Sequence, residues 1–432
     1  MIVPTTLDMA RDSMIGRMGL IRVCKTILCS PGEPRLHSVT VIPAETAVYM
    51  DANIVGEAGA VGFTHAQAIH GAIGECIERY SCAYVNPELT VHASKEDLGD
   101  DAIGMDEFAI HADAQYDTPG WPFPRWRADH PITWVRGRSL LTGARRYVPA
   151  SLVYVPWMPS DPSDLLTLAV STGQSCHTDF DLACLTGLYE VVERDAFMIT
   201  WLRKLRTTRV DYQDDAGLAR LYQRHFAGCD LTFHVFDMTT DLRIPSMLCI
   251  VEGRSHKGAI FGMGASTRLS EREAISKALL EAAQDMIWCR DLVRRKPDWR
   301  PAPDWSNIRD FQDHVRLYCE PEMRSELAFL LDGDRRRSVE EEPTPSSVQD
   351  RLATALDRVR TVGLDCILVD TTAPDVAAAG FHAPKIFIPR TAPLTAVHSL
   401  LALGSPRLQT VPRWLGQEDR LDALNLVPHP FP

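Results

Sequence analysis

The sequence predicts an α/β fold of mixed α+β type, with helices packed on mixed β-sheets, and two kinds of pattern support this class. Short apolar runs, alternating or compact, are typical of strands. Amphipathic helical patterns lie between these runs, and no short-period repeat is present, which excludes a solenoid. The order of the elements leaves the pairing of the strands open. The predicted strands include residues 231–236, 247–251, 366–369 and 385–388.

The first long helix is expected to run from Thr64 to about Ser81. The tetrapeptide Thr64-His-Ala-Gln67 fits a capping box, in which both side chains satisfy free backbone amides. At about 100° per residue, one side of this helix is apolar and the other carries Glu75, Glu78 and Arg79. A solvent-exposed face explains these charges as well as a binding site does.

The second helix is expected from about Asp179 to Trp201, and it repeats the Glu-x-x-Glu-Arg pattern as Glu190, Glu193 and Arg194. Its apolar residues cover well over half of the circumference, more than the stripe of about 100° on a surface helix. Carboxylates in such surroundings need a partner charge, hydrogen bonds or a cation. If the two helices face each other, four carboxylates meet, and Mg²⁺ that carries nucleotide phosphates is the usual cation for such a cluster.

The third helix is expected from about Ser270 to Arg295. It places Lys277, Glu281, Gln284 and Asp285 on one strip, opposite an apolar side. A solvated face and a ligand site explain this strip equally well.

The 432 residues are expected to form one domain with a helical insertion at about 297–346 and a proline-rich tail at 426–432. Proline-bearing stretches at 297–305 and 340–347 bracket the insertion. Eleven cysteines occur without CxxC pairs or a zinc-type spacing, which predicts reduced and mostly buried thiols.

Charge and composition argue against several classes of function. A net charge of −12 argues against broad binding to the phosphate backbone of nucleic acids. No apolar tract is long enough to cross a bilayer, so no membrane role is expected. The first residues lack the basic start and apolar stretch of a secretory signal, and a cytoplasmic location is therefore expected.

At the doubled Glu-x-x-Glu-Arg motif the sequence resembles the YcaO superfamily, and more narrowly the SagD-like D proteins of thiazole/oxazole-forming cyclodehydratases. The stretches that carry the resemblance extend in order over nearly the whole chain. They are residues 62–68 with 74–81, residues 171–173 with 189–197, residues 281–284, and residues 369–375. The tail Pro428-His-Pro-Phe-Pro432 is similar to the Pro-x-Pro-x-Pro end of azoline-forming members.

The resemblance implies a YcaO-like ATP-binding fold without a P-loop, and the sequence contains no Gly-x-x-x-x-Gly-Lys-Ser/Thr. It implies ATP and Mg²⁺ as cofactors. The metal-site residues implied are Glu75, Glu78, Glu190 and Glu193. The ATP-site residues implied are Arg79, Arg194, Ser171, Glu281 and Gln284. The C-terminal carboxylate of Pro432 is implied as the catalytic base, delivered by a stiff proline-rich arm. Adding one residue after Pro432 should then cripple turnover and leave the fold intact.

The reaction implied is ATP-dependent cyclodehydration of Cys, Ser or Thr residues in a ribosomal precursor peptide to thiazoline or oxazoline rings. ATP would phosphorylate the amide oxygen after the side chain has added to the carbonyl. The resemblance further implies a ThiF-like C protein that binds the leader peptide, and it brings in an FMN dehydrogenase and a homodimer as further candidates.

Three positions depart from the family pattern. Val61 stands where a lysine is common, Gly71 where a serine is common, and Thr172 within a motif that often reads Ser-Asn-Gly. Two rival functions therefore stay open. One is another YcaO reaction, thioamide or amidine formation; the other is a non-catalytic scaffold for peptide or partner. An unrelated carboxylate-rich enzyme is a more remote alternative.

Overall fold

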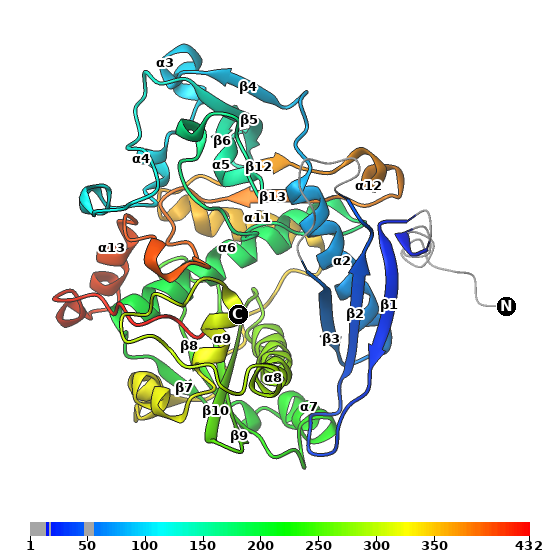
Figure 1. Ribbon diagram of the computed structural model, residues 1–432. Coiled ribbons are helices and arrows are strands. Elements are labelled where there is room, and N and C mark those ends of the chain that lie inside the picture. The colour runs from blue at the N-terminus through cyan, green and yellow to red at the C-terminus, as the bar shows by residue number, and fades with distance from the viewer. Residues whose placement is uncertain (1–13, 17–18, 47–55) are drawn as a thin grey trace. The chain divides into compact units, whose positions relative to one another are not determined.

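The computed structural model describes residues 14–16, 19–46 and 56–432, and the chain divides into two compact units (Figure 1). Of the described residues, the first unit comprises 14–16, 19–28, 37–46, 56–191 and 346–391, and the second comprises 29–36, 192–345 and 392–432. The long helix α6, Phe180–Arg203, begins in the first unit and ends in the second. The sequence-based prediction of one domain with an insertion did not include this division.

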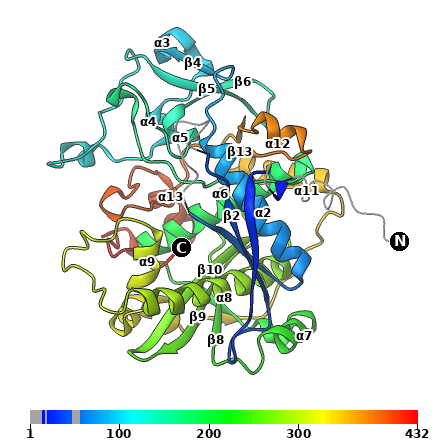
Figure 2. The same ribbon diagram turned by 45° about the vertical axis from the view of Figure 1, so that its right-hand side comes forward.

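The first unit contains two sheets. An antiparallel sheet of order β1-β2-β3 is formed by Ile21–Ile27, His37–Pro43 and Ala58–Gly62. Helix α2, His65–Ala83, lies along this sheet (Figure 2), and its buried side chains share one core with β1 to β3. The other sheet has the order β13-β12-β5-β4, and β6 also pairs with β5. Its strands are Pro384–Phe387, Ile367–Asp370, Ile132–Ser139, Thr90–Ala93 and Arg145–Pro149.

The remaining helices of the first unit are α3 Lys95–Leu98, α4 Met105–Phe108, α5 Ala150–Val153, α11 Val348–Thr361 and α12 Pro374–Ala378. Its 3₁₀ turns are Gly99–Asp101, Asp113–Asp117 and Pro162–Asp164.

The second unit contains one sheet of order β10-β9-β8-β7-β11, and α8, Glu271–Arg295, packs on β9 and β10. Gly264 allows this close approach, because a Cβ there would lie 2.2 Å from the backbone nitrogen of Ala282. The strands are Gly258–Thr267, Ser246–Ser255, Thr232–Asp237, Thr208–Val210 and Arg336–Arg337. The other helices are α7 Ala216–His225, α9 Phe311–Leu317, α10 Ala328–Leu331 and α13 Arg407–Trp414. The 3₁₀ turns are Tyr212–Asp214, Pro321–Leu327, His398–Leu400 and Glu418–Arg420.

The structure confirms the three long helices and the four strands predicted from the sequence. The capping box of α2 is present, since the backbone amide of Gln67 donates to Thr64 Oγ1 and that of Thr64 donates to Gln67 Oε1, each over 3.2 Å. The segment predicted as a helical insertion, residues 297–346, contains α9, α10 and a 3₁₀ turn. It also contains β11, which joins the sheet.

Two further expectations bear on chemistry. The eleven cysteines are all free thiols, and seven of them are buried, as predicted. Among the described residues, no helix combines the length and apolar character needed to cross a bilayer.

Candidate functional site

The first acidic strip lies on α2, next to β3. Glu75 Oε2 accepts a hydrogen bond of 2.7 Å from the backbone amide of Gly59, and its Oε1 accepts one of 2.6 Å from Arg79 Nη2. The other terminal nitrogen of Arg79 donates to the backbone carbonyl of Glu57 over 3.0 Å. The backbone of β3 and one arginine therefore fix Glu75 in place.

Glu78, one turn further along α2, is the most perturbed carboxyl group of this strip. Loss of hydration raises its pKa well above the usual value, and the negative charges of Glu190 and then Glu75 raise it further. A backbone hydrogen bond from Cys176 and the charge of Arg79 act in the opposite direction. Within the first unit, the charges of one carboxylate on α2 and one on α6 therefore act on Glu78. The metal site of four glutamates stays a prediction.

Glu190 on α6 is held by the turn that precedes the helix. Its Oε2 accepts a hydrogen bond of 3.1 Å from the backbone amide of Gly173. Gly173 has a φ of 81°, and a Cβ there would lie 2.1 Å from the carbonyl oxygen of Ile386. Only glycine fits this turn, so the role of Gly173 is to bring its amide to Glu190. Ser171, a predicted ATP-site residue, is exposed two positions earlier, and its carbonyl accepts from the amide of Gln174 over 2.8 Å.

The second unit holds the other half of the α6 motif. Glu193 is buried, and its Oε2 accepts a hydrogen bond of 3.1 Å from the backbone amide of Thr267 at the end of β10. Arg194 Nη1 lies 3.5 Å from Glu193 Oε1, and the Arg194 guanidinium lies over the ring of Phe431, 4.1 Å from the ring centre. Such a cation–π contact holds the arginine side chain over the face of the aromatic ring.

The predicted strip on α8 consists of Lys277, Glu281, Gln284 and Asp285. Lys277 Nζ donates to Glu281 Oε1 over 2.5 Å, which is an ordinary i, i+4 pair, and Gln284 is half-buried. Asp285 is 3% exposed and its Oδ2 accepts a hydrogen bond of 2.8 Å from the backbone amide of Met263. Burial raises the pKa of Asp285 to about 8. The assignment of Glu281 and Gln284 to the ATP site stays a prediction.

The tail is packed into the second unit. Side chains hold three successive carbonyls: Trp201 Nε1 donates to Val427 over 2.9 Å, Tyr318 Oη donates to Pro428 over 2.7 Å, and His314 Nδ1 lies 2.7 Å from the carbonyl oxygen of His429. Phe431 is 1% exposed and Pro432 is half-buried. The role expected for the Pro432 carboxylate stays a prediction.

Sequence reasoning missed several groups that complete these contacts. The amides of Gly59 and Gly173 were not predicted as partners of the carboxylates, although both glycines flank the predicted motifs. Lys385 was also missed. It is 1% exposed on β13, and burial lowers its pKa, while Cys82 and then the charge of Glu190 oppose that shift. A lysine within the apolar run 385–388 was the signal in the sequence that could have revealed it.

Within residues 14–16, 19–46 and 56–432, no group of three or more His, Cys, Asp or Glu side chains is close enough to hold a metal ion by itself. Mg²⁺ that carries a nucleotide needs only one or two protein carboxylates, because water and phosphate oxygens complete its shell. The chemistry of the strip fits such an ion, because the mutual repulsion that raises the pKa of Glu78 is relieved by a bound cation.

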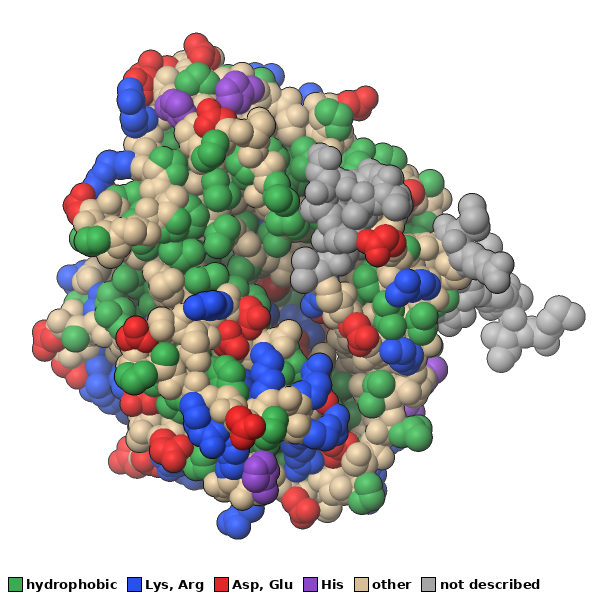
Figure 3. All heavy atoms as spheres, viewed as in Figure 1, with side chains coloured by type: hydrophobic (Ala, Val, Ile, Leu, Met, Phe, Trp, Pro, Cys, Tyr) green, Lys and Arg blue, Asp and Glu red, His purple; other side chains and the backbone are tan. Residues whose placement is uncertain are grey.

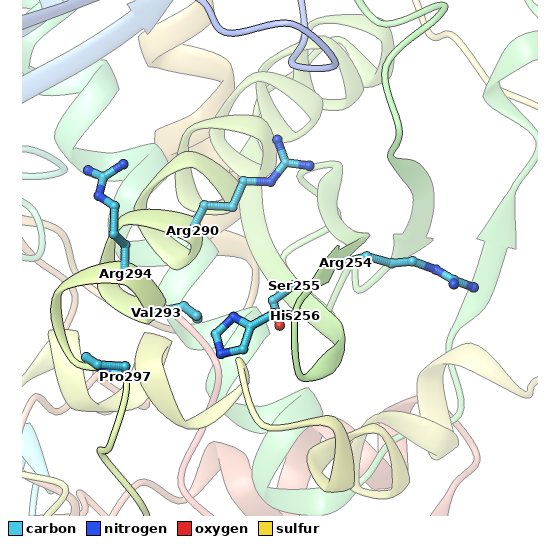
Figure 4. A pocket seen from close by; sticks show the side chains of 7 residues that line it. All are labelled: Arg254, Ser255, His256, Arg290, Val293, Arg294 and Pro297. Atoms are coloured by element: carbon cyan, nitrogen blue, oxygen red, sulfur yellow. The ribbon is translucent and has the colours of Figure 1, made fainter.

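A hollow of about 410 Å³ lies elsewhere, at the end of α8 and the β9–β10 hairpin. Arg254, Arg290 and Arg294 line it, but Figure 4 shows their guanidinium groups pointing in different directions. Figure 3 shows acidic side chains among the basic ones on the face it displays, and Arg290 and Arg294 pair with Glu33 and Asp291. None of the predicted site residues lines this hollow.

Comparisons with known proteins identify the family and the fold of the chain. Residues 59–392 match a family model described as "YcaO cyclodehydratase, ATP-ad Mg2+-binding". The family description names both cofactors predicted from the sequence and confirms them. A curated relative, an uncharacterized protein of Methanothermobacter thermautotrophicus, is 26% identical over 227 residues, which make up 52% of this chain and 55% of that protein.

Two solved structures share the fold. A heterocyclase in complex with substrate and cofactor is 22% identical, with a TM-score of 0.79 over 99% of this chain and 57% of that one. YcaO from Methanopyrus kandleri, bound with AMPPCP and Mg²⁺, is 19% identical, with a TM-score of 0.62 over 88% of this chain and 89% of that one. These likenesses confirm the mixed α+β class. The chain spans about half the length of the curated relative and of the heterocyclase.

Proposed function

Because the chain belongs to the YcaO cyclodehydratase family, we propose that it catalyses ATP- and Mg²⁺-dependent cyclodehydration of Cys, Ser or Thr residues in a ribosomally made precursor peptide. The products would be thiazoline or oxazoline rings. The observation that carries the proposal is the electrostatic coupling of Glu78 to Glu75 and Glu190, two residues from the doubled motif on two helices. Such a concentration of negative charge has a use if a divalent cation binds there.

In this proposal Glu75, Glu78, Glu190 and Glu193 hold Mg²⁺ directly or through its water shell. Backbone amides already fix three of them, since Gly59, Gly173 and Thr267 donate to Glu75, Glu190 and Glu193 respectively. Carboxylates that are oriented in advance lose little conformational entropy when they bind an ion.

The arginines of the two motifs would contact phosphate oxygens. Arg79 is tied to Glu75 and to a backbone carbonyl, and Arg194 lies between Glu193 and Phe431. When bound, ATP with Mg²⁺ supplies the phosphoryl group that makes the amide oxygen of the peptide a leaving group. The protein offsets the charge on that phosphoryl group with positioned guanidinium groups. Ser171, Glu281 and Gln284 would line the nucleotide site.

We further propose that the chain acts with a ThiF-like leader-binding protein, as SagD-like members do, and that an FMN dehydrogenase can follow it. A cytoplasmic location and a homodimer belong to the same proposal. The resemblance of the doubled motif and the tail to azoline-forming members supports it.

The decisive experiment combines the purified chain, ATP and Mg²⁺ with a ThiF-like protein and a short Cys/Ser/Thr-rich peptide, both to be sought among the neighbouring genes. Mass spectrometry of the peptide should show the loss of one water per ring, together with release of ADP. Glu78→Gln and Glu190→Gln should abolish ring formation. Glu88→Gln changes an exposed carboxylate of the same unit and should retain ring formation.

The outcomes separate the rival functions. A peptide that gains sulfur in place of oxygen would indicate thioamide formation, and ATP-independent binding of the peptide without mass change would indicate a scaffold. Either result would refute the proposed reaction.

A further inference from the structure

Lys385 is a fully enclosed cation whose three N–H donors match three backbone acceptors. It is 1% exposed, and its Nζ donates to the carbonyl oxygens of Val153 and Val170 over 3.0 Å each and to that of Leu152 over 3.1 Å. The Sγ of Cys82, near the end of α2, lies 3.7 Å away. A lysine ammonium has three donors, so these carbonyls satisfy it completely.

These acceptors come from segments that are far apart in the sequence. Leu152 and Val153 belong to α5, and Val170 immediately precedes the turn 171–173. The backbone of β13 holds the same turn from the other side, because the amide of Ile386 donates to the carbonyl of Gly173 over 2.9 Å. The turn that presents the Gly173 amide to Glu190 is therefore attached to β13 through both the backbone and the Lys385 side chain.

The charge of Lys385 matters as well as its hydrogen bonds. Removing a lysine from water is costly, and a neutral side chain could donate to backbone carbonyls at lower cost. Burial accordingly lowers the pKa of Lys385, whereas Cys82 and, to a smaller extent, the negative charge of Glu190 favour its charged form. The opposite charges of Lys385 and Glu190 therefore attract each other.

We propose that Lys385 is a positioning residue of the Mg²⁺- and nucleotide-binding site. Its ammonium group holds residues 170–173 against β13, and this fixes the Gly173 amide on Glu190. The inference rests on the proposed function, in which Glu190 contributes to the metal site. The side chain itself is enclosed by protein and acts through the turn.

The test compares Lys385→Gln with a matched control. Glutamine retains two N–H donors but removes the charge. Ser139→Ala is the control, because Ser139 is 1% exposed in the same unit and its hydroxyl donates to Asp365 over 2.7 Å, remote in sequence from the turn. Both variants lose hydrogen bonds of a buried group, so both should lower the thermal midpoint.

Two measurements are made on the intact chain. Hydrogen exchange of the Gly173 amide, without ligand, should accelerate about tenfold or more in Lys385→Gln, as expected for the loss of one charged hydrogen bond. Calorimetric titration with AMPPCP and Mg²⁺ should show a similar loss of affinity. Ser139→Ala should match the wild type in both measurements.

A second variant separates charge from shape. Lys385→Arg keeps the charge and the donors, and should restore most of the protection of Gly173 and of the affinity. Equal losses in the Gln and Arg variants, or wild-type behaviour of the Gln variant, would overturn the proposal. If the wild type fails to bind AMPPCP with Mg²⁺, the proposed function fails, and the exchange of Gly173 still decides whether Lys385 holds the turn.

Discussion

Replacing Gly71 with serine, the residue common at this position in the family, is expected to destabilise this protein. Gly71 lies on α2 where the helix meets β3, and a Cβ at this position would lie 2.8 Å from the Cβ of Ala60. Neither atom can rotate away, so the helix and the strand must separate. Ala60 follows Gly59, whose amide donates to Glu75, and the separation should weaken that 2.7 Å hydrogen bond.

The expected size follows from two opposing contributions. Overpacking of this kind costs about 1–3 kcal/mol, while exchanging glycine for serine inside a helix recovers about 0.5 kcal/mol. Gly71→Ser should therefore lower the free energy of unfolding by about 0.5–2.5 kcal/mol. Gly74→Ser is the matched control on the same helix, because a Cβ there has its nearest contact at 4.0 Å, and this variant should be as stable as the wild type or slightly more stable.

Urea unfolding measures these differences, provided that the m-value is unchanged. The double variant Gly71→Ser with Ala60→Gly removes the collision and should recover about 1 kcal/mol or more beyond the sum of the single changes. The affinity for AMPPCP with Mg²⁺ should fall in Gly71→Ser and recover in the double variant. A Gly71→Ser protein as stable as the wild type, or a double variant with strictly additive effects, would refute this account of the helix–strand contact.

Three further outcomes are expected. Burial raises the pKa of Asp285 to about 8, so the folded state holds a proton that the unfolded state releases above about pH 4. The free energy of unfolding should therefore fall as the pH rises from about 4 to 8, by up to ~1.4 kcal/mol per pH unit. In urea unfolding Asp285→Asn should remove this slope, and a pH-independent difference between the variant and the wild type would contradict the prediction. Arg407→Met should lose about 3–5 kcal/mol, because it leaves the fully buried Asp195 without its partner at 2.9 Å, and adding Asp195→Asn should recover part of the loss in thermal unfolding. Phe431→Leu retains apolar volume but removes the ring beneath Arg194. The loss of this ring should lower the free energy of unfolding in urea by about 1 kcal/mol and weaken AMPPCP binding. Unchanged AMPPCP binding would show that the ring does not contribute to the nucleotide site.

Local patterns were sufficient to predict the long helices and several strands. The capping box at Thr64 and the apolar stripe of α2 depend on residues three and four apart, and the structure contains both. The same patterns could not predict the division into two units or the order of the strands. Those depend on which apolar faces meet across hundreds of residues.

For the candidate site as well, contacts between residues far apart in the sequence could not be predicted. The repeated motif predicted four carboxylates for the site, and in the structure the charges of Glu190 and Glu75 both act on Glu78. Their backbone partners were not predictable, because a backbone amide has no residue type of its own to recognise. Lys385 is separated from its carbonyl partners by more than 200 residues, so only tertiary structure reveals what it binds.

The packing of helix α6 explains how its buried carboxylates can be accommodated in the folded protein. Most of its surface is buried, so three of its four carboxylates, Glu190, Glu193 and Asp195, cannot reach bulk water by a small rotation of the helix. Each of them instead accepts a hydrogen bond from a different backbone amide; the donors are residues 173, 267 and 392. Rotating or sliding the helix by one residue would break all three bonds and also displace its apolar contacts. The packing that removes these carboxylates from water therefore also fixes their positions along the helix. Side chains on a rigid helix are held more accurately for binding a ligand than side chains on a loop.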